Sequence, residues 1–175
     1  KHVVRSSDQW STDHETADVD GDGDLDLVAL TKTALVWLEN PNWELHVIDD
    51  VVLHDIEVAD FDSDGDFDVV GRDQGEFGHS GALLHFYRQD DGKNWFHREL
   101  TCPDGEGLKV SDIDADDDVD VVVNSVWLEN TGDIEHGVWD QHVYAERWMH
   151  SATFVATQDI NGDGRTDILL SPSEV

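Results

Sequence analysis

The sequence predicts an all-β protein built from repeated four-stranded antiparallel sheets, the arrangement of a β-propeller. Three observations lead to this prediction. A nine-residue acidic motif begins at residues 18, 60, 112 and 159, with spacings of 42, 52 and 47 residues. Periods of this length are typical of repeat architectures. Short β-branched and aromatic runs separated by turn residues fill each interval, and no segment keeps a 3.6-residue apolar period over three turns.

The similarity between the copies extends beyond the acidic motif. The residues VWLEN at 36–40 recur at 126–130, and we align 84–88 (LHFYR) as their divergent middle copy. A segment led by Trp43, Trp95 or Trp139 follows each of them. Because one such sheet cannot bury both of its faces alone, we expect the repeats to stack side by side. A β-solenoid is the alternative, although its repeats are usually shorter.

Each repeat is predicted to form four strands. In the second repeat these are 55–59, 67–70, 82–87 and 95–100, with turn-forming residues at 90–94 between the last two. We expect blades at 14–50, 54–101 and 107–146, the first half of another at 150–175, and the last strand of a preceding blade at 1–4. Residues 1–175 then form one domain of about three and a half blades, part of a larger ring.

The charge excludes several classes of partner. The chain has 41 acidic and 10 basic residues, a formal net charge of -31. Nucleic acid is excluded because phosphate binding needs Lys and Arg, and anionic membrane surfaces are disfavoured for the same reason. No apolar run approaches the roughly 20 residues of a membrane span, so we expect no membrane insertion. With 38% hydrophobic residues and seven Trp, the chain can still build a core.

The acidic motif has the form D-x-[DN]-x-D-[GD]-x-x-D, and its four copies hold 19 of the 41 acidic residues. Calcium takes six to eight oxygen ligands, and in the EF-hand loop they come from positions 1, 3, 5 and 7, with Gly at position 6. The motif has the same offsets, and the Asp at position 9 would close the cage. We therefore predict up to four Ca²⁺ ions, one per loop, with position 7 contributing its backbone carbonyl. The predicted ligands are Asp18, Asp20, Asp22, Asp24 and Asp26; Asp60, Asp62, Asp64, Asp66 and Asp68; Asp112, Asp114, Asp116, Asp118 and Asp120; and Asp159, Asn161, Asp163, Arg165 and Asp167.

A simpler explanation is that these segments are only good hairpin turns. Turn chemistry accounts for an Asp-Gly pair, but not for crowded carboxylates in four copies, whose repulsion a divalent cation relieves. Magnesium fits less well because it prefers tight octahedral geometry and retained waters. Two departures stand out: Arg165 at position 7, and Asp117 in place of Gly at position 6. We expect the third site to be the weakest or the most distorted.

The loops with their flanking strands resemble FG-GAP/VCBS repeats, the unit of integrin-α-like β-propellers. The residues that carry the resemblance are 17–28, 59–70 and 159–169, and it extends over essentially the whole chain. It implies a propeller of typically seven blades with calcium between the first and second strands of a blade. It also implies a secreted or cell-surface setting and a role in adhesion or carbohydrate binding. Similar propellers occur in polysaccharide lyases and a sugar dehydratase, so the resemblance leaves enzyme and binder open.

A second site is predicted on the face opposite the acidic loops. The loops there are 6–14, 49–54, 102–107 and 146–150, with a long insertion at 71–81. His14, His54 and His150 each lie shortly before an inner strand, and with Arg72 they could bind a sugar or a transition metal beside Trp10 and Trp148. We favour the simpler interpretation that these histidines are polar caps at strand entries, because their spacing to the acidic loop differs from repeat to repeat. His46, His97 and His142 recur within the fourth strands and are interpreted as packing residues.

The leading hypothesis is a non-catalytic, calcium-stabilised propeller module of an extracellular protein that binds a glycan or a protein or assembles with itself. The sequence has no Ser or Cys nucleophile motif, no phosphate-binding loop and no zinc-hydrolase signature. One alternative is the propeller domain of a polysaccharide- or sugar-modifying enzyme, of the lyase or dehydratase type, with its site at His14, His54, His150 and Arg72. Another is a structural subunit of an extracellular polymer.

Overall fold

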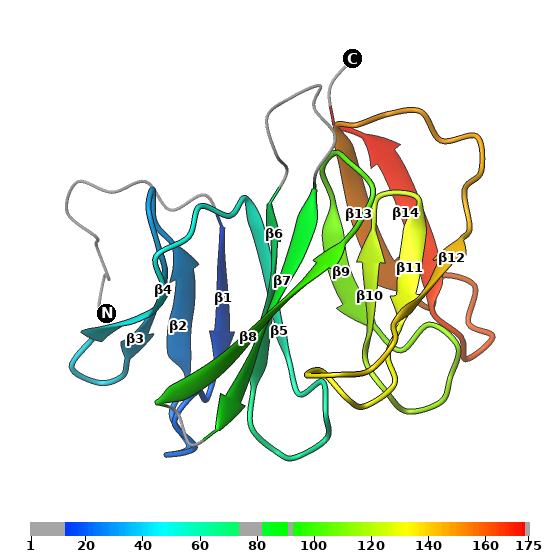
Figure 1. The fold of residues 1–175 in the computed structure, drawn as a ribbon. Helices are drawn as coiled ribbons and strands as arrows, with labels where there is room; N and C mark the ends of the chain where they lie inside the picture. Colours follow the sequence, from blue (N-terminus) through cyan, green and yellow to red (C-terminus); the bar gives the residue numbers. More distant parts are fainter. Residues whose placement is uncertain (1–12, 74–81, 91–92, 174–175) are drawn as a thin grey trace.

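The computed structural model describes residues 13–73, 82–90 and 93–173, and all secondary structure within these ranges is β (Figure 1). Three antiparallel four-stranded sheets follow one another along the chain, and a two-stranded hairpin comes after them. Each sheet has its strands in sequence order, so every neighbouring pair is joined by a hairpin connection. The predicted all-β architecture of four-stranded antiparallel sheets is confirmed.

The strands have the following bounds. The first sheet contains β1 (His14–Ala17), β2 (Asp26–Leu30), β3 (Leu35–Glu39) and β4 (Glu44–Asp49). The second sheet contains β5 (Asp55–Ala59), β6 (Asp68–Asp73), β7 (Leu83–Asp90) and β8 (Asn94–Thr101). The third sheet contains β9 (Leu108–Ser111), β10 (Asp120–Val123), β11 (Val126–Glu129) and β12 (Asp140–Val143). The terminal hairpin contains β13 (Thr153–Gln158) and β14 (Asp167–Pro172).

The sheets lie side by side in chain order, like propeller blades. The first strand of each sheet contacts the first strand of the next, so that β1, β5, β9 and β13 are successive neighbours. The hairpins β1–β2, β5–β6, β9–β10 and β13–β14 all turn at the lower edge in Figure 1. The four acidic loops therefore share one edge of the molecule. Closure into a ring and the number of blades stay predictions.

The core fills the spaces between the sheets. Trp37, Tyr87 and Ile56 are among the buried residues packed between the first and second sheets. Phe86 packs against Trp139 between the second and third sheets, with ring centroids 4.7 Å apart. The β-branched and aromatic residues that predict strands therefore have a second role, because each strand alternates its side chains between two neighbouring sheets.

Polar side chains also join neighbouring sheets. The carboxylate of Asp13, just before β1, accepts a hydrogen bond from the backbone N–H of Ile56 in β5 at 2.9 Å. Lys109 of β9 forms an ion pair with Glu57 of β5. Burial is the main cause that raises the pKa of Glu57 to about 7, and the Lys109 ammonium only partly opposes it. The inner strands are thus linked by partly buried polar contacts as well as by apolar packing.

Several strand bounds differ from the prediction. The strand expected at 67–70 extends to Asp73, so the beginning of the insertion predicted at 71–81 belongs to β6. The strand expected at 82–87 continues to Asp90, and that expected at 95–100 is β8. The strand predicted at 1–4, Trp10, and most of the loop at 6–14 lie outside the described residues.

The repeat in the second sheet is displaced by one residue from the sequence alignment. The N–H that bonds to the Asp at position 9 of the acidic loop belongs to Asn40, Gln89 and Asn130 in the three sheets. The segment equivalent to VWLEN is therefore 85–89, not 84–88. Because side chains alternate between faces, this shift also corrects the grouping of the histidines. His46 and His142 are equivalent to Arg98, while His97 lies on the opposite face of its sheet.

Candidate metal-binding loops

All four acidic loops share one backbone conformation. Positions 4 and 6 have positive φ in every copy. At position 4 the angles are 72° for Gly21, 58° for Ser63, 68° for Ala115 and 78° for Gly162. At position 6 they are 95° for Gly23, 99° for Gly65, 76° for Asp117 and 84° for Gly164. The Gly preference at position 6 was visible in the sequence, but position 4 is Gly in only two copies, so its left-handed conformation was missed.

Carboxylates at positions 1 and 5 hold this conformation by accepting backbone hydrogen bonds. In the first loop Asp18 Oδ2 accepts from the N–H of Gly23 at 2.9 Å, and Asp22 Oδ1 accepts from that of Asp24 at 2.8 Å. The same two bonds recur in the other three loops. Such bonds fix the orientation of the carboxylates at positions 1 and 5 relative to the backbone of the loop.

The Asp at position 9 connects the loop to the sheet. Asp68 is the example: Oδ2 accepts from the N–H of Phe61 at position 2, and Oδ1 accepts from the N–H of Gln89 in β7. Asp26 and Asp120 make the equivalent pair of bonds, and all three side chains are buried. From the sequence, the Asp at position 9 was predicted only as a metal ligand. Its position before a β-branched strand gives no signal of the second bond, which comes from the third strand of the sheet.

The donor set in the loops suits a hard cation. One oxygen from each of Asp18, Asp20 and Asp22 lies within 4.8 Å of the others. The second and third loops form the same kind of group from positions 1, 3 and 9. Asp18 Oδ1 is buried and finds no hydrogen-bond partner among the described residues. A buried carboxylate oxygen without a donor is costly, and a cation with oxygen ligands would satisfy it. The residues present therefore fit Ca²⁺.

The raised pKa values of buried aspartates in the loops are also consistent with a cation site. Burial raises the pKa of Asp68 to about 7 and that of Asp120 to about 6, although two backbone donors oppose the shift in each case. Burial is also the largest cause of the raised pKa of Asp26, with the neighbouring Asp20 and Asp22 carboxylates adding to it. Without a cation, the ionised forms of these buried groups destabilise the folded chain.

The third and fourth loops depart from the pattern in different ways. In the third, Asp112 Oδ2 still accepts from the N–H of Asp117, at 3.2 Å, so the missing Gly leaves the hydrogen-bond pattern intact and is accommodated as backbone strain. Its weaker affinity stays a prediction. In the fourth, Arg165 donates its backbone N–H to Asp163 and is exposed. Hydrogen bonds to the backbone lower the pKa of Asp159 in this loop.

Of the residues predicted for the opposite face, His54 and Arg72 are neighbours, because the backbone N–H of His54 donates to the carbonyl of Arg72 at 2.9 Å. Arg72 is fully buried in β6, and its guanidinium donates to the carbonyls of Gly107 at 2.7 Å and Pro103 at 2.5 Å. It therefore links the second sheet to the loop before the third. His14 begins β1, His54 precedes β5 and His150 precedes β13. Within the described residues, none of these histidines belongs to a metal-ligating cluster.

An open depression of about 610 Å³ does lie on the loop after β12, lined by residues 143–148. Trp148 is half-buried there and donates from Nε1 to Thr153 Oγ1 at 2.9 Å. Its ring meets that of His150 at a centroid distance of 4.9 Å, edge to face. Of the residues predicted for a second site, Trp148 and His150 are therefore brought together.

No protein-family model matches the chain, and no curated protein matches it in sequence. Among the described residues there is no helix long and apolar enough to cross a membrane.

Proposed function

We propose that the chain is a calcium-binding β-propeller module of an extracellular protein, of the kind its FG-GAP/VCBS-like repeats imply. In this proposal each acidic loop holds one Ca²⁺, and the ions stabilise the hairpins that form one edge of the array of sheets. The module acts in binding a glycan or a protein rather than in catalysis. Ring closure with further blades is part of the same proposal.

The observation that carries the proposal is the identical conformation of four loops with divergent residues. Ser63 and Ala115 take the same left-handed backbone as glycines elsewhere, although this costs each residue about 1 kcal/mol. Three carboxylates lie close together in each of the first three loops, and Asp18 leaves a buried oxygen without a donor among the described residues. Repulsion between these carboxylates would open such loops, so a bound dication explains why four copies retain them.

Calcium titration of two matched variants tests this proposal. Asp22→Asn changes a predicted side-chain ligand at position 5, while Asp24→Asn removes an equal charge at position 7, where only the backbone carbonyl is a ligand. In Asp22→Asn the amide oxygen can still accept from the N–H of Asp24, and the side chain of Asp24 is exposed, so both variants are expected to fold. We expect isothermal titration to show at least tenfold weaker binding at one site in Asp22→Asn and little change in Asp24→Asn. Equal losses in both variants would mean that the loops attract calcium only through their charge.

The depression lined by residues 143–148 is the place where we propose that a neutral glycan binds. Trp148 offers an aromatic face, and the charged side chains of Glu146 and Arg147 lie beside it. Such a combination is suited to sugars, whose C–H faces stack on rings and whose hydroxyls need polar partners. The strongly acidic surface disfavours polyanions, so the glycan is neutral or basic.

Binding to a panel of immobilised glycans tests this part. We expect Trp148→Ala to abolish binding to whichever neutral glycan is retained, and Met149→Ala, at an exposed residue that does not line the depression, to leave it intact. If no neutral or basic glycan is retained by the calcium-loaded chain, or if Trp148→Ala binds as well as the parent, the glycan assignment is wrong. Turnover of a polysaccharide by the chain would favour the enzyme alternative instead.

A further inference from the structure

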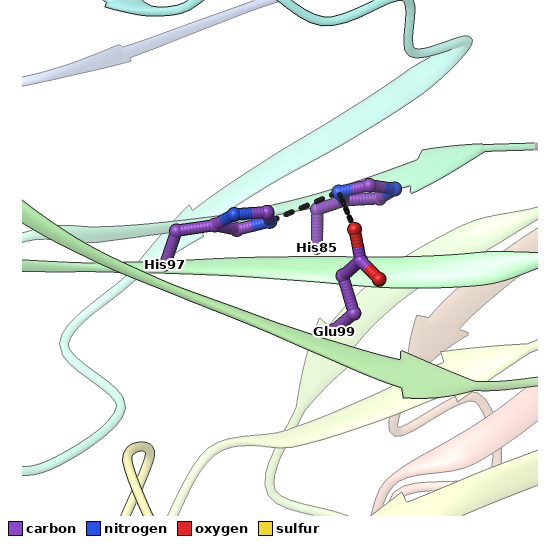
Figure 2. Close-up of side chains that lie close together, drawn as sticks. All are labelled: His85, His97 and Glu99. Carbon is purple, nitrogen blue, oxygen red and sulfur yellow. Dashed lines mark hydrogen bonds and ion pairs between the residues drawn. The ribbon is translucent and has the colours of Figure 1, made fainter.

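Two histidines and a glutamate meet on one face of the second sheet (Figure 2). His85 lies on β7, and His97 and Glu99 lie on β8. His85 Nδ1 is 3.0 Å from His97 Nε2 and 3.9 Å from Glu99 Oε1. Figure 2 shows the imidazole edges and the carboxylate turned toward the same point. One potential ligand atom from each residue lies within 4.8 Å of the other two.

The repeat provides an internal comparison for these positions. In the first sheet the cross-strand pair equivalent to His85 and Glu99 is Val36 and Val47, and His97 corresponds to Leu45. In the third sheet the pair is Val126 and Val143, and Gln141 stands in the place of His97. The backbone thus needs no ligating side chain here, because aliphatic residues occupy all three positions in the first sheet and two of the three in the third. In the second sheet all three positions carry a potential metal ligand.

Burial makes His85 an unfavourable replacement for valine if packing is its only role. The side chain is only 5% exposed, and Nε2 is buried without a hydrogen-bond partner among the described residues. Burying an imidazole with one unsatisfied nitrogen is unfavourable compared with burying an aliphatic side chain. The ring of His85 stacks parallel to that of His97, with their centroids 5.2 Å apart. The ring of His97 in turn stacks on Tyr87, and this stacking holds the imidazoles in place.

Other histidines on the outer strands have a simpler explanation. His46 stacks on Trp37 and bonds to Glu39, and His142 stacks on Trp127 and bonds to Glu129. This arrangement recurs at equivalent positions in two sheets, contains one nitrogen ligand, and is accounted for by packing. The cluster of His85, His97 and Glu99 lies on the other face and does not recur. It is therefore not a copy of the packing histidines.

We propose that His85, His97 and Glu99 form a site for a borderline transition-metal cation, with Zn²⁺ as its chemical type. Two imidazole nitrogens and one carboxylate oxygen are ligands that zinc prefers, while calcium takes oxygen ligands. Two nitrogens bound to one tetrahedral zinc stand about 3.3 Å apart, close to the observed spacing. Three protein ligands leave one position for water. For both nitrogens to bind the metal, the proton between His85 Nδ1 and His97 Nε2 would move to the other nitrogen of its own ring, so that each neutral imidazole still carries one proton.

The test replaces ligands of the proposed site with the residues that stand at the equivalent positions of the first sheet. His97→Leu and Glu99→Val introduce the residues that the same fold already carries at Leu45 and Val47, and both positions are exposed, so the variants are expected to fold. His142→Leu is the matched control, because it removes a half-buried strand histidine with a glutamate partner. Zn²⁺ is titrated into the full chain with excess Ca²⁺ present, so that oxygen sites are occupied. Co²⁺ absorption serves as a second readout, because nitrogen-ligated tetrahedral cobalt absorbs strongly in the visible range.

We expect one Zn²⁺ per chain in the parent and in His142→Leu, with a tetrahedral cobalt spectrum in both. Binding should weaken by on the order of 100-fold in His97→Leu, and clearly in Glu99→Val, with the cobalt bands lost in His97→Leu. Melting curves confirm that each variant is folded. Absence of zinc binding by the parent overturns the proposal, and so does binding that His97→Leu leaves unchanged. Both results leave the calcium proposal untouched, because the two sites share no residue.

Discussion

Replacing Asn130 by alanine should destabilise the protein far more than the same change at the equivalent residue of the first sheet. Asn130 is 3% exposed, and its amide nitrogen donates to the carbonyl of Phe61 at 2.7 Å, in the acidic loop of the neighbouring sheet, and to that of Val119 at 3.0 Å. Its carbonyl accepts from the N–H of Gly132. Among the described residues, the side chain of Asn40 makes one hydrogen bond, an exposed one of 3.2 Å to the carbonyl of Leu25.

The magnitude follows from the groups left behind. Asn130→Ala removes three hydrogen bonds and leaves the buried carbonyl of Phe61 without this donor, so we expect a loss of about 3 kcal/mol. Asn40→Ala removes one exposed bond and should cost about 0.5–1 kcal/mol. In a chain of this size the larger loss lowers the melting temperature by roughly 6–12 °C.

Urea unfolding of both variants, followed by tryptophan fluorescence at saturating calcium, measures the difference. Neither substitution alters the backbone N–H that bonds to Asp26 or Asp120, so the comparison isolates the side chain. Equal losses in the two variants would refute the reasoning, because they would mean that the link from the third sheet to the second carries no stability.

Three further predictions concern charge and backbone. In EDTA, unfolding free energy should fall between pH 5 and pH 8, because a carboxyl whose folded pKa is raised, such as Asp68 at about 7, contributes stability below its unfolded pKa that is lost as pH rises through the folded value. In calcium the unfolding free energy should instead rise over this pH range, because Ca²⁺ competes with protons for the carboxylates. Urea titrations at pH 5 and pH 8, with and without calcium, measure both trends. Asp117→Gly should raise the melting temperature by a few degrees, since it relieves a φ of 76°, whereas Asp117→Ala should not. Gly105→Ala should cost about 3 kcal/mol or more in urea unfolding, because its Cβ would lie 2.4 Å from the Ser151 carbonyl oxygen, whereas Gly132→Ala, with open space, should cost about 1 kcal/mol.

The repeat made the fold predictable. A period of about 47 residues with four short apolar runs leaves few arrangements other than four-stranded antiparallel sheets, and the bounds of β5 were predicted to the residue. The alignment of the second repeat failed because Leu84 and Phe86 offer the same apolar alternation as Val36 and Leu38. Only the bond from Gln89 to Asp68 fixes the register, and a bond between strands leaves no mark in a single sequence.

The acidic loops were predictable from composition and spacing, but the partners of their residues were not. The two N–H groups that Asp68 accepts from lie 7 and 21 residues away, and the left-handed backbone at Ala115 contradicts the residue's own preference. Arg72 was a candidate for a ligand site, and nothing in the sequence indicated that tertiary packing would bury it against two carbonyls. The meeting of His85 with His97 depends on cross-strand register, so it could not be derived without the correct alignment.

Thermal unfolding of the parent chain in excess calcium and in excess EDTA tests the central claim most directly. If four sites are each filled to about 100 times their dissociation constant, linkage adds about 2.7 kcal/mol per site, and the melting temperature should rise by roughly 20 °C or more. Restoring calcium should restore the higher value. Coincident melting curves in calcium and in EDTA, with no Ca²⁺ retained by the purified chain, would contradict the claim that the four loops are calcium sites.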